Sequence, residues 1–245
     1  MSVDAFFRWT ELDATTFRGW RDAILAAGAD DNQPRRYPGY PRWPLAPVRA
    51  RLWPSLDRVL ERRRCRYPPG TTLPSRGQLS RLLGMAHGIT GKSYAGPVPS
   101  AGGLQALELY LGILHPGWLP PGIYHYDRIG HFLSQIAAEP AAGMWERAVP
   151  SLQQVQGGSV LWLLIGDGAR VKAKYSERGL RFLLLEAGHL MQNICLLSAS
   201  LGWVTMPLGG FFERDIARRL QLPRTDVVLY TGVSGAAPSA TPNQC

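Results

Sequence analysis

A lysine and a tyrosine stand side by side at Lys174 and Tyr175, with a second lysine at Lys172. An ammonium group next to a phenol stabilises the charged form of the phenol, and a desolvated lysine can itself accept a proton. The pair therefore has the chemistry to move a proton at a ligand within hydrogen-bonding distance. Two exposed lysines beside a packed tyrosine would give the same spacing, so the residues alone leave both interpretations open.

Four polar residues interrupt the apolar stretch that follows: Glu186, His189, Gln192 and Asn193. Spacings of three and four place Glu186, His189 and Asn193 on one helix face, with Gln192 close beside them. Each polar group left unpaired in a buried helix costs about 1–3 kcal/mol, so we expect this helix to contact a polar ligand or to brace a subunit contact. Glu186 and His189 have the spacing of half a di-iron site, but the sequence lacks the second half, and we expect no metal.

An arginine cluster is the second candidate binding feature. It comprises Arg58, Arg62, Arg63, Arg64 and Arg66. Arginines this dense repel one another unless an anion neutralises them, and a guanidinium group matches two phosphate oxygens at a time. The cluster therefore predicts a phosphate-binding site or, alternatively, a solvated basic helix end. No nucleic-acid recognition motif accompanies it, so we expect no nucleic-acid partner.

Two glycine-containing loops could bring the backbone close to a flat or charged ligand. The sequence reads PVPSAGG over residues 97–103 and PLGGF over residues 207–211. The first is neither a Walker A loop nor a GxGxxG dinucleotide fingerprint, because the required residues and spacing are absent. It could also be an ordinary connection, and the second loop carries little weight alone.

These residues need a framework of short helices and strands to position them. Apolar periodicity and capping residues predict helices over residues 15–27, 55–64, 75–87, 141–156, 177–201 and 213–220. Strands are predicted over residues 106–113, 123–126, 131–133, 159–166, 203–207 and 226–233, with a hairpin at residues 123–133. Because helices and strands do not alternate strictly, the pattern favours an α+β fold.

Composition narrows the class of protein further. The 245 residues are 45% hydrophobic and 18% charged, as is typical of a globular chain with one core. We expect an N-terminal arm over residues 1–54, a domain over residues 55–235 and a flexible tail over residues 236–245. The formal net charge of +9 favours anionic partners. The three cysteines are far apart in the sequence, the N-terminus does not resemble a signal peptide, and no run reaches about 18 apolar residues. We therefore expect a cytoplasmic protein that does not cross a membrane.

Five short motifs follow one another over most of the chain, from about residue 60 to residue 235. They are RRRCR (62–66), PSAGG (99–103), IYHYD (123–127), KYSERGLRFLLLEAGHLMQN (174–193) and PLGGF (207–211). In this order they resemble the nitroreductase-like FMN oxidoreductases. The resemblance is closest to the azoline oxidases, the thiazole- and oxazole-forming dehydrogenases of ribosomal peptide pathways.

That resemblance implies an α+β fold with a central mixed or antiparallel sheet, flanking helices and a long central helix at a dimer interface. It also implies a homodimer with FMN bound between the subunits. By position, the cofactor-binding residues would be Arg62, Arg63, Arg64, Arg66, Pro99, Ser100, Ala101, Gly102, Gly103, Gln105, Asn193, Gly209 and Gly210. The arginines would hold the phosphate and ribityl chain, the 99–103 loop and Gln105 would lie against the isoalloxazine ring, and the remaining residues would reach its polar edge.

Two positions depart from the family pattern. Arg64 stands where family members usually carry a serine. The residues after Val233 also lack the basic residue that many nitroreductases use for the phosphate. The arginine cluster is therefore expected to do more of that binding.

Lys174 and Tyr175 match the Lys-Tyr pair assigned to catalysis in the azoline oxidases, which ordinary nitroreductases lack. The resemblance thus implies an FMN-dependent oxidase that converts azolines to aromatic azoles, or a related dehydrogenase. Its substrate would be a peptide or carrier-bound intermediate, and a cyclodehydratase is a candidate partner. The alternatives are a general NAD(P)H-dependent nitro or quinone reductase, and a flavin-free scaffold or peptide-binding subunit. Either Lys174 or Tyr175 could be the base. Glu186 and His189 are expected to brace the helix within the dimer. Lys172 is expected to be a charged surface residue.

Overall fold

One antiparallel sheet runs through the described part of the chain. The computed structural model describes residues 3–26, 33–48, 54–138 and 143–238. Within them the sheet has seven strands in the order β1-β4-β3-β2-β5-β7-β6, and each neighbouring pair is antiparallel. The strands are β1 (Arg42–Pro44), β2 (Leu107–Ile113), β3 (Gly122–Asp127), β4 (Phe132–Ala138), β5 (Val160–Asp167), β6 (Trp203–Leu208) and β7 (Asp226–Ala236).

The central strands are apolar along their whole length because both faces of the sheet are covered. On β5, Val160 and Trp162 belong to one buried cluster, whereas Leu161 and Leu163 belong to the other. Successive side chains of a strand point to opposite faces, so one strand contributes to both clusters. The sheet therefore lies between two hydrophobic layers.

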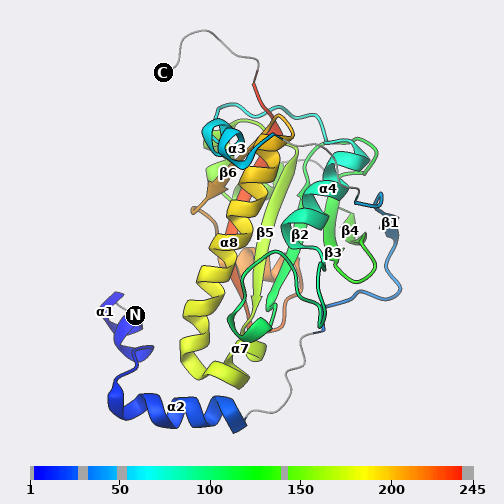
Figure 1. Ribbon diagram of the computed structural model, residues 1–245. Helices are drawn as coiled ribbons and strands as arrows, with labels where there is room; N and C mark the ends of the chain where they lie inside the picture. Colours follow the sequence, from blue (N-terminus) through cyan, green and yellow to red (C-terminus); the bar gives the residue numbers. More distant parts are fainter. Residues whose placement is uncertain (1–2, 27–32, 49–53, 139–142, 239–245) are drawn as a thin grey trace.

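Helices form these two layers. They are α1 (Val3–Trp9), α2 (Ala14–Ala26), α3 (Leu56–Arg62), α4 (Arg76–His87), α5 (Gly143–Ala148), α6 (Ser151–Val155), α7 (Gly168–Tyr175), α8 (Gly179–Ser200) and α9 (Glu213–Arg219), with two 3-10 turns, η1 (Ala101–Gly103) and η2 (Ser176–Arg178). Figure 1 shows the long helix α8 crossing one face of the sheet beside α4. Residues of α5, α6 and α9 pack in the cluster on the opposite face.

The fold expected from the sequence is confirmed: an α+β chain with an antiparallel sheet, flanking helices and one long helix. Local signals account for several boundaries. Ser75 caps α4, because its hydroxyl accepts a hydrogen bond from the Gln78 main chain while the Gln78 side chain accepts one from the Ser75 main chain at 3.0 Å. The hairpin expected at residues 123–133 is formed by β3 and β4.

Two features of this region were not predicted. Lys172 and Tyr175, which precede the long helix as expected, lie on a helix of their own, α7, and η2 turns the chain into α8. The helix is also not buried all round, because Leu184 and Leu185 are 50% and 59% exposed. A helix that packs on one sheet buries only the face that meets it, so the apolar residues on the other face of α8 remain uncovered in a single chain.

Within the described residues, one helical stretch is long and apolar enough to cross a membrane, judged by length and composition alone. It spans Gly168–Ser200, and its most apolar window has a mean hydropathy of 1.3. The sequence had led us to expect no such stretch. In the fold, α8 packs against α4, α7, β6 and β7. The central helix of a globular core passes the same test, so this finding is weak support for a membrane span.

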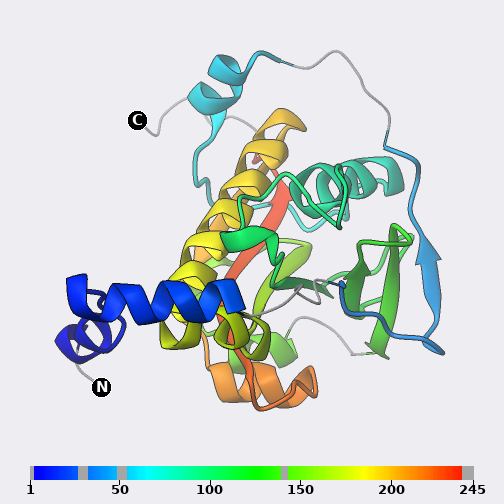
Figure 2. The same ribbon diagram turned by 60° about the horizontal axis from the view of Figure 1, so that its bottom comes forward.

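The described parts of the N-terminal arm pack against the rest of the chain. Residues 33–48 run along the surface and add β1 to the edge of the sheet beside β4. Arg35 anchors them, since its guanidinium lies 2.7 Å from the Asp226 carboxylate and its main chain donates to Glu108 at 2.9 Å. Helices α1 and α2 lie beside α7 and the start of α8 (Figure 2). The last residues of the expected tail, 239–245, lie outside the described residues.

Candidate functional site

The lysine–tyrosine pair lies at the end of α7, the helix that directly follows the central strand β5. Strand β5 ends at Asp167, whose carboxylate caps α7 by accepting a hydrogen bond from the Arg170 main chain at 3.0 Å. This cap fixes where α7 begins. Tyr175 is buried and 7% exposed, and Lys174 is half-buried, with its Nζ 5.8 Å from the centre of the Tyr175 ring.

The 99–103 loop touches this pair. It forms the turn η1, in which Gly102 and Gly103 have φ angles of 59° and 72°. A Cβ atom on Gly102 would overlap the Tyr175 hydroxyl and would lie 3.0 Å from Lys174 Nζ. Only a glycine can take this backbone conformation at this closeness without strain. The structure therefore brings together two predicted features that are about seventy residues apart in the sequence.

A buried carboxylate holds the same loop from the other side. Glu186, on α8, accepts a hydrogen bond from the Ser100 hydroxyl at 2.7 Å, and Ser100 accepts one from the Gln105 main chain at 2.8 Å. Glu186 is 3% exposed, and its second oxygen has no hydrogen-bond partner. Burial raises the pKa of Glu186 to about 7, although Ser100 and the nearby Arg128 oppose the shift. The sequence led us to expect Glu186 to brace a dimer, whereas here it binds a loop of its own chain.

Residues that the sequence did not single out complete this site. Trp20, on α2, donates from its indole nitrogen to the Tyr175 main-chain oxygen at 3.4 Å, and the two rings are 6.1 Å apart. The arm is held in place from α8, where Arg181 donates to the Phe7 main-chain oxygen at 2.6 Å. No pattern in the sequence links residue 20 to residue 175, because the contact exists only after the arm has packed on α7.

Arg128 is the second residue that the sequence did not reveal. Its guanidinium donates to the Gln105 side-chain oxygen at 2.9 Å, and Gln105 belongs to the predicted cofactor-binding set. Burial, together with the nearby positive charge of Arg128, lowers the pKa of His87 to about 3. His87 is therefore neutral near pH 7, and its Nε2 lies 3.1 Å from the Leu107 main-chain oxygen.

The arginine cluster lies beside a later part of α8 than the 99–103 loop does. Arg62, Arg64 and Arg66 are exposed at the end of α3, and Arg63 is half-buried. Burial raises the pKa of the Cys195 thiol to about 11, and the nearby Arg63 opposes that shift. Ser100 contacts α8 nine residues earlier, at Glu186. Nine residues of helix correspond to roughly 14 Å, so one chain does not bring the arginines into contact with the Lys174–Tyr175 pair.

The other predicted residues take separate positions. Asn193 is half-buried and donates to the Ala86 main-chain oxygen at 3.4 Å. Gly209 and Gly210 follow β6 and are exposed, and the Ser151 hydroxyl donates to the Gly210 oxygen at 3.1 Å. His189 lies at the surface, where its Nδ1 is 3.4 Å from the Pro99 main-chain oxygen. Lys172 is exposed and pairs with Glu177 at 3.0 Å, in agreement with its expected place on the surface.

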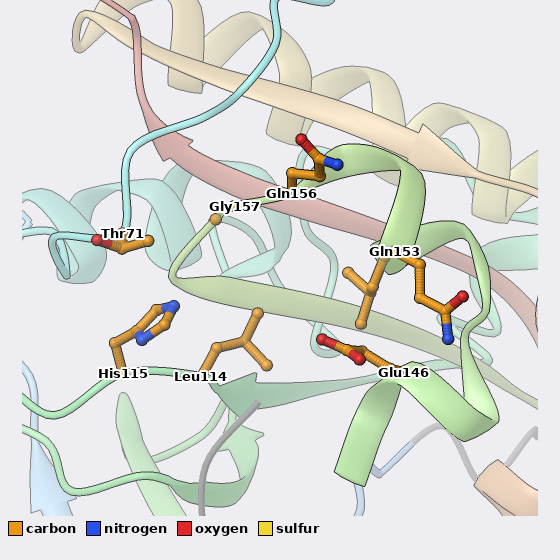
Figure 3. Close-up of a pocket in the computed structure, with 9 residues that line it drawn as sticks. Thr71, Leu114, His115, Glu146, Gln153, Gln156 and Gly157 are labelled. Carbon is orange, nitrogen blue, oxygen red and sulfur yellow. The ribbon is translucent and has the colours of Figure 1, made fainter. Parts of the chain in front are cut away.

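A cavity of about 390 Å³ opens elsewhere, between the end of β2 and helices α5 and α6 (Figure 3). His115, Glu146 and Gln153 are among the residues that line it, and the Glu146 carboxylate points toward it. None of the predicted site residues lines this cavity. It is therefore distinct from the site that the 99–103 loop and the Lys174–Tyr175 pair build.

The raised pKa of Glu186 predicts a pH-dependent stability. Its folded value of about 7 lies above its ordinary value of 4.5, so ionisation opposes folding. Its contribution to stability is complete below pH 4.5 and is lost as the pH rises through 7, with a total of at most roughly 3 kcal/mol. Urea unfolding at pH 5 and pH 8 should show a smaller loss with pH in Glu186→Gln than in the wild type. Exposed Glu61→Gln serves as the control and should keep the wild-type loss; an equal loss in all three proteins would refute the assignment.

Comparisons with known proteins agree on one family. The sequence profile of the Nitroreductase family matches residues 59–235. A protein of Methanocaldococcus jannaschii that is named as a nitroreductase is 29% identical over 175 residues, which cover 71% of this chain and 87% of the relative.

Solved structures show the same fold. A nitroreductase-type protein from Ralstonia eutropha JMP134 matches with a TM-score of 0.70 and 21% identity, over 85% of this chain and 95% of that one. The Escherichia coli microcin synthetase McbBCD complex, with truncated pro-MccB17 bound, matches with a TM-score of 0.60 and 18% identity, over 97% and 88%. A nitroreductase-type protein from Exiguobacterium sibiricum in complex with FMN matches with a TM-score of 0.53 and 13% identity, over 78% and 92%.

Proposed function

The chain belongs to the nitroreductase family, and on that premise we propose that it is an FMN-dependent dehydrogenase that converts azolines to aromatic azoles, or performs a related dehydrogenation, on a peptide natural-product intermediate. The observation that carries the proposal is the contact between Gly102 and the Lys174–Tyr175 pair. The pair that would transfer the proton thus lies against the loop that would support the flavin ring. The match to the microcin synthetase complex supports a biosynthetic role and, with it, a partner protein.

The residues present fit FMN. In the described chain none of Arg62, Arg63 and Arg66 has an acidic partner, so the three guanidinium groups are available to a phosphate. A Cβ atom on Gly103 or on Gly209 would meet nothing within 4 Å, so there is space for a flat ring beside both residues. The family match and the FMN complex of one structural neighbour support the same cofactor.

We further propose that two copies of the chain complete each site. The arginine cluster and the Lys174–Tyr175 pair lie apart on one chain, and FMN between two subunits would join them. The exposed leucines of α8, Leu184 and Leu185, supply an apolar surface for such a contact, with Leu56 and Leu60 on α3 adding to it. Burying exposed apolar side chains is the main favourable term in association.

In the proposed reaction the residues have separate tasks. Dehydrogenation of an azoline breaks two C–H bonds: a proton leaves one ring carbon and a hydride leaves its neighbour. Bound FMN would accept the hydride. The Lys174–Tyr175 pair would take the proton, and Trp20 and Gly102 hold the pair in place. Glu186 and Ser100 fix the loop, which would orient the ring of a bound flavin relative to the base.

The purified protein tests the proposal. We expect a yellow protein with a flavin absorption band near about 450 nm, and a substrate that loses two hydrogen atoms when an azoline-containing peptide is supplied with O₂. NADPH oxidation driven by a nitroaromatic, without loss of hydrogen from an azoline, would favour a general nitro or quinone reductase. A colourless protein that FMN does not reconstitute would refute both enzyme functions and favour a scaffold or peptide-binding subunit.

The arginine cluster gives a prediction for cofactor binding. Replacing Arg62 and Arg66 together by alanine should weaken FMN binding by at least about 100-fold, because two charged contacts to the phosphate are lost. Flavin fluorescence during titration of the apoprotein measures the dissociation constant. Arg76→Ala, an exposed arginine outside the cluster, is the matched control and should bind FMN as the wild type does. Unchanged affinity in the double variant would place the phosphate elsewhere.

A further inference from the structure

The cavity of about 390 Å³ beside helices α5 and α6, here called the α5–α6 cavity, has an apolar floor and a polar edge. Leu114, directly after β2, and Leu152, on α6, line it and are buried. Thr71, Gln153 and Gln156 line it and are exposed. Its volume falls within the range of roughly 300–1,000 Å³ that is usual for ligand pockets, and such pockets combine apolar walls with a few polar groups in the same way.

A carboxylate supplies the charge of the α5–α6 cavity. Glu146, on α5, is half-buried and points its carboxylate toward the cavity (Figure 3). In the described chain this carboxylate has neither an ion-pair partner nor a hydrogen-bond donor. An ionised carboxylate accepts several hydrogen bonds, and partial shielding from water strengthens its attraction to a cation. Glu146 therefore retains its full capacity to bind a positive group in the cavity.

The charge of this cavity is opposite to the charge of the whole chain. The chain carries 27 basic against 18 acidic residues, yet the described residues that line the cavity include no lysine and no arginine. Arg147 follows Glu146 directly but is exposed and does not belong to the lining. A cavity that is lined by one sign of charge concentrates ligands of the other sign. The α5–α6 cavity is therefore suited to a cation, in contrast to the arginine cluster.

A second nitrogen-binding group belongs to the same lining. His115 lines the cavity, and Figure 3 shows His115 and Glu146 on either side of Leu114. A ring nitrogen of an imidazole accepts a hydrogen bond from an N–H group when it carries no proton. A ligand with several N–H donors has acceptors at two places along this wall.

We propose that the α5–α6 cavity binds an organic cation, a guanidinium or an ammonium group that is carried on an apolar stem. The cation would donate charge-assisted hydrogen bonds to Glu146. The stem would cover Leu114 and Leu152. The cation can come from an arginine or from a lysine side chain of a peptide. This inference depends neither on FMN nor on dehydrogenation, because none of the proposed active-site residues lines the cavity.

Calorimetric titration of the full-length protein with three probes tests the proposal and distinguishes the two cations. The probes are acetyl-arginine amide, acetyl-lysine amide and the neutral acetyl-citrulline amide, which has nearly the shape of the arginine probe. We expect at least one cationic probe to bind about 10-fold or more tightly than the neutral one. The tighter of the two cationic probes identifies the group. A neutral probe that binds as tightly as both cations, or binding of none of the three, would overturn the proposal.

Variants locate the binding. Glu146→Gln keeps the shape of the side chain and removes its charge, and it should weaken the preferred cationic probe by roughly 10-fold. Gln153→Lys adds a positive charge at the edge of the cavity and should weaken the same probe by repulsion or by pairing with Glu146. Because Gln153 is exposed, this variant carries the test if Glu146→Gln does not fold.

The matched control is Glu213→Gln, which makes the same chemical change at an exposed glutamate outside the cavity. It should leave the affinity for the cationic probe unchanged. Unchanged affinity in folded Glu146→Gln or in Gln153→Lys would refute the site. A loss in Glu213→Gln equal to that in Glu146→Gln would show that the probe responds to the overall charge and would refute it as well.

Discussion

Replacing Lys174 by alanine or Tyr175 by phenylalanine will leave FMN bound and lower the rate of azoline dehydrogenation by roughly 10²- to 10⁴-fold. That range is what a positioned acid or base contributes to a rate. Both side chains lie against Gly102, so their loss removes proton transfer at the loop without removing the proposed flavin contacts. Single-turnover reduction of the flavin by an azoline peptide measures the effect, and the absorption spectrum before mixing verifies that FMN is retained.

The matched control for this result is Lys172→Ala. Lys172 is exposed on the same helix, two residues before Lys174, and pairs with Glu177 at the surface. A surface ion pair contributes little, at most about 1 kcal/mol, so this variant should retain wild-type activity. Full activity in both Lys174→Ala and Tyr175→Phe would remove the pair from the mechanism. Because Trp20 holds Tyr175 from its main-chain oxygen, that contact survives the phenylalanine substitution.

Gly102→Ala will have the second large effect, although it adds only one methyl group. The new Cβ atom would overlap the Tyr175 hydroxyl and approach Lys174 Nζ to 3.0 Å, so the pair or the loop must move. A misplacement of about 1 Å at reacting groups can cost about 100-fold in rate, and we expect a fall in kcat of that size. Steady-state kinetics with the same azoline peptide measures it.

Gly103→Ala separates this clash from backbone strain. Gly103 has a φ of 72°, close to the 59° of Gly102, so either alanine costs roughly 1–2 kcal/mol of stability. A Cβ atom on Gly103 meets nothing within 4 Å, however. Thermal unfolding should therefore show similar losses in the two variants, while kcat falls strongly only in Gly102→Ala. Equal losses of kcat would show that strain, and not the contact with Tyr175, controls the rate.

The elements of the fold were largely predictable because their signals are local. Ser75 and Gln78 form a reciprocal capping box, which marks the start of α4 within four residues. The apolar run that became β5 is flanked by glycines and is recognisable in isolation. Helix α1 was not predicted, since its seven residues carry too short a pattern for periodicity to identify.

The exposure of α8 was not predictable in the same way. Its sequence is apolar on almost every side, and periodicity cannot tell a helix covered by its own chain from one covered by another. Leu184 and Leu185 lie at the surface of the described chain only because the sheet, α4 and α7 occupy the other sides. The proposed dimer gives those leucines a partner.

By itself the sequence determined the order of most helices and strands, the family motifs and the residue types available for chemistry. The tertiary structure alone decided that Gly102 meets Tyr175, that Glu186 holds Ser100, and that Trp20 and Arg128 support the site. The physical reason is that caps and apolar periods act within a few residues, whereas these contacts join segments more than twenty residues apart. Such contacts depend on strand register and helix packing, which the whole chain settles together.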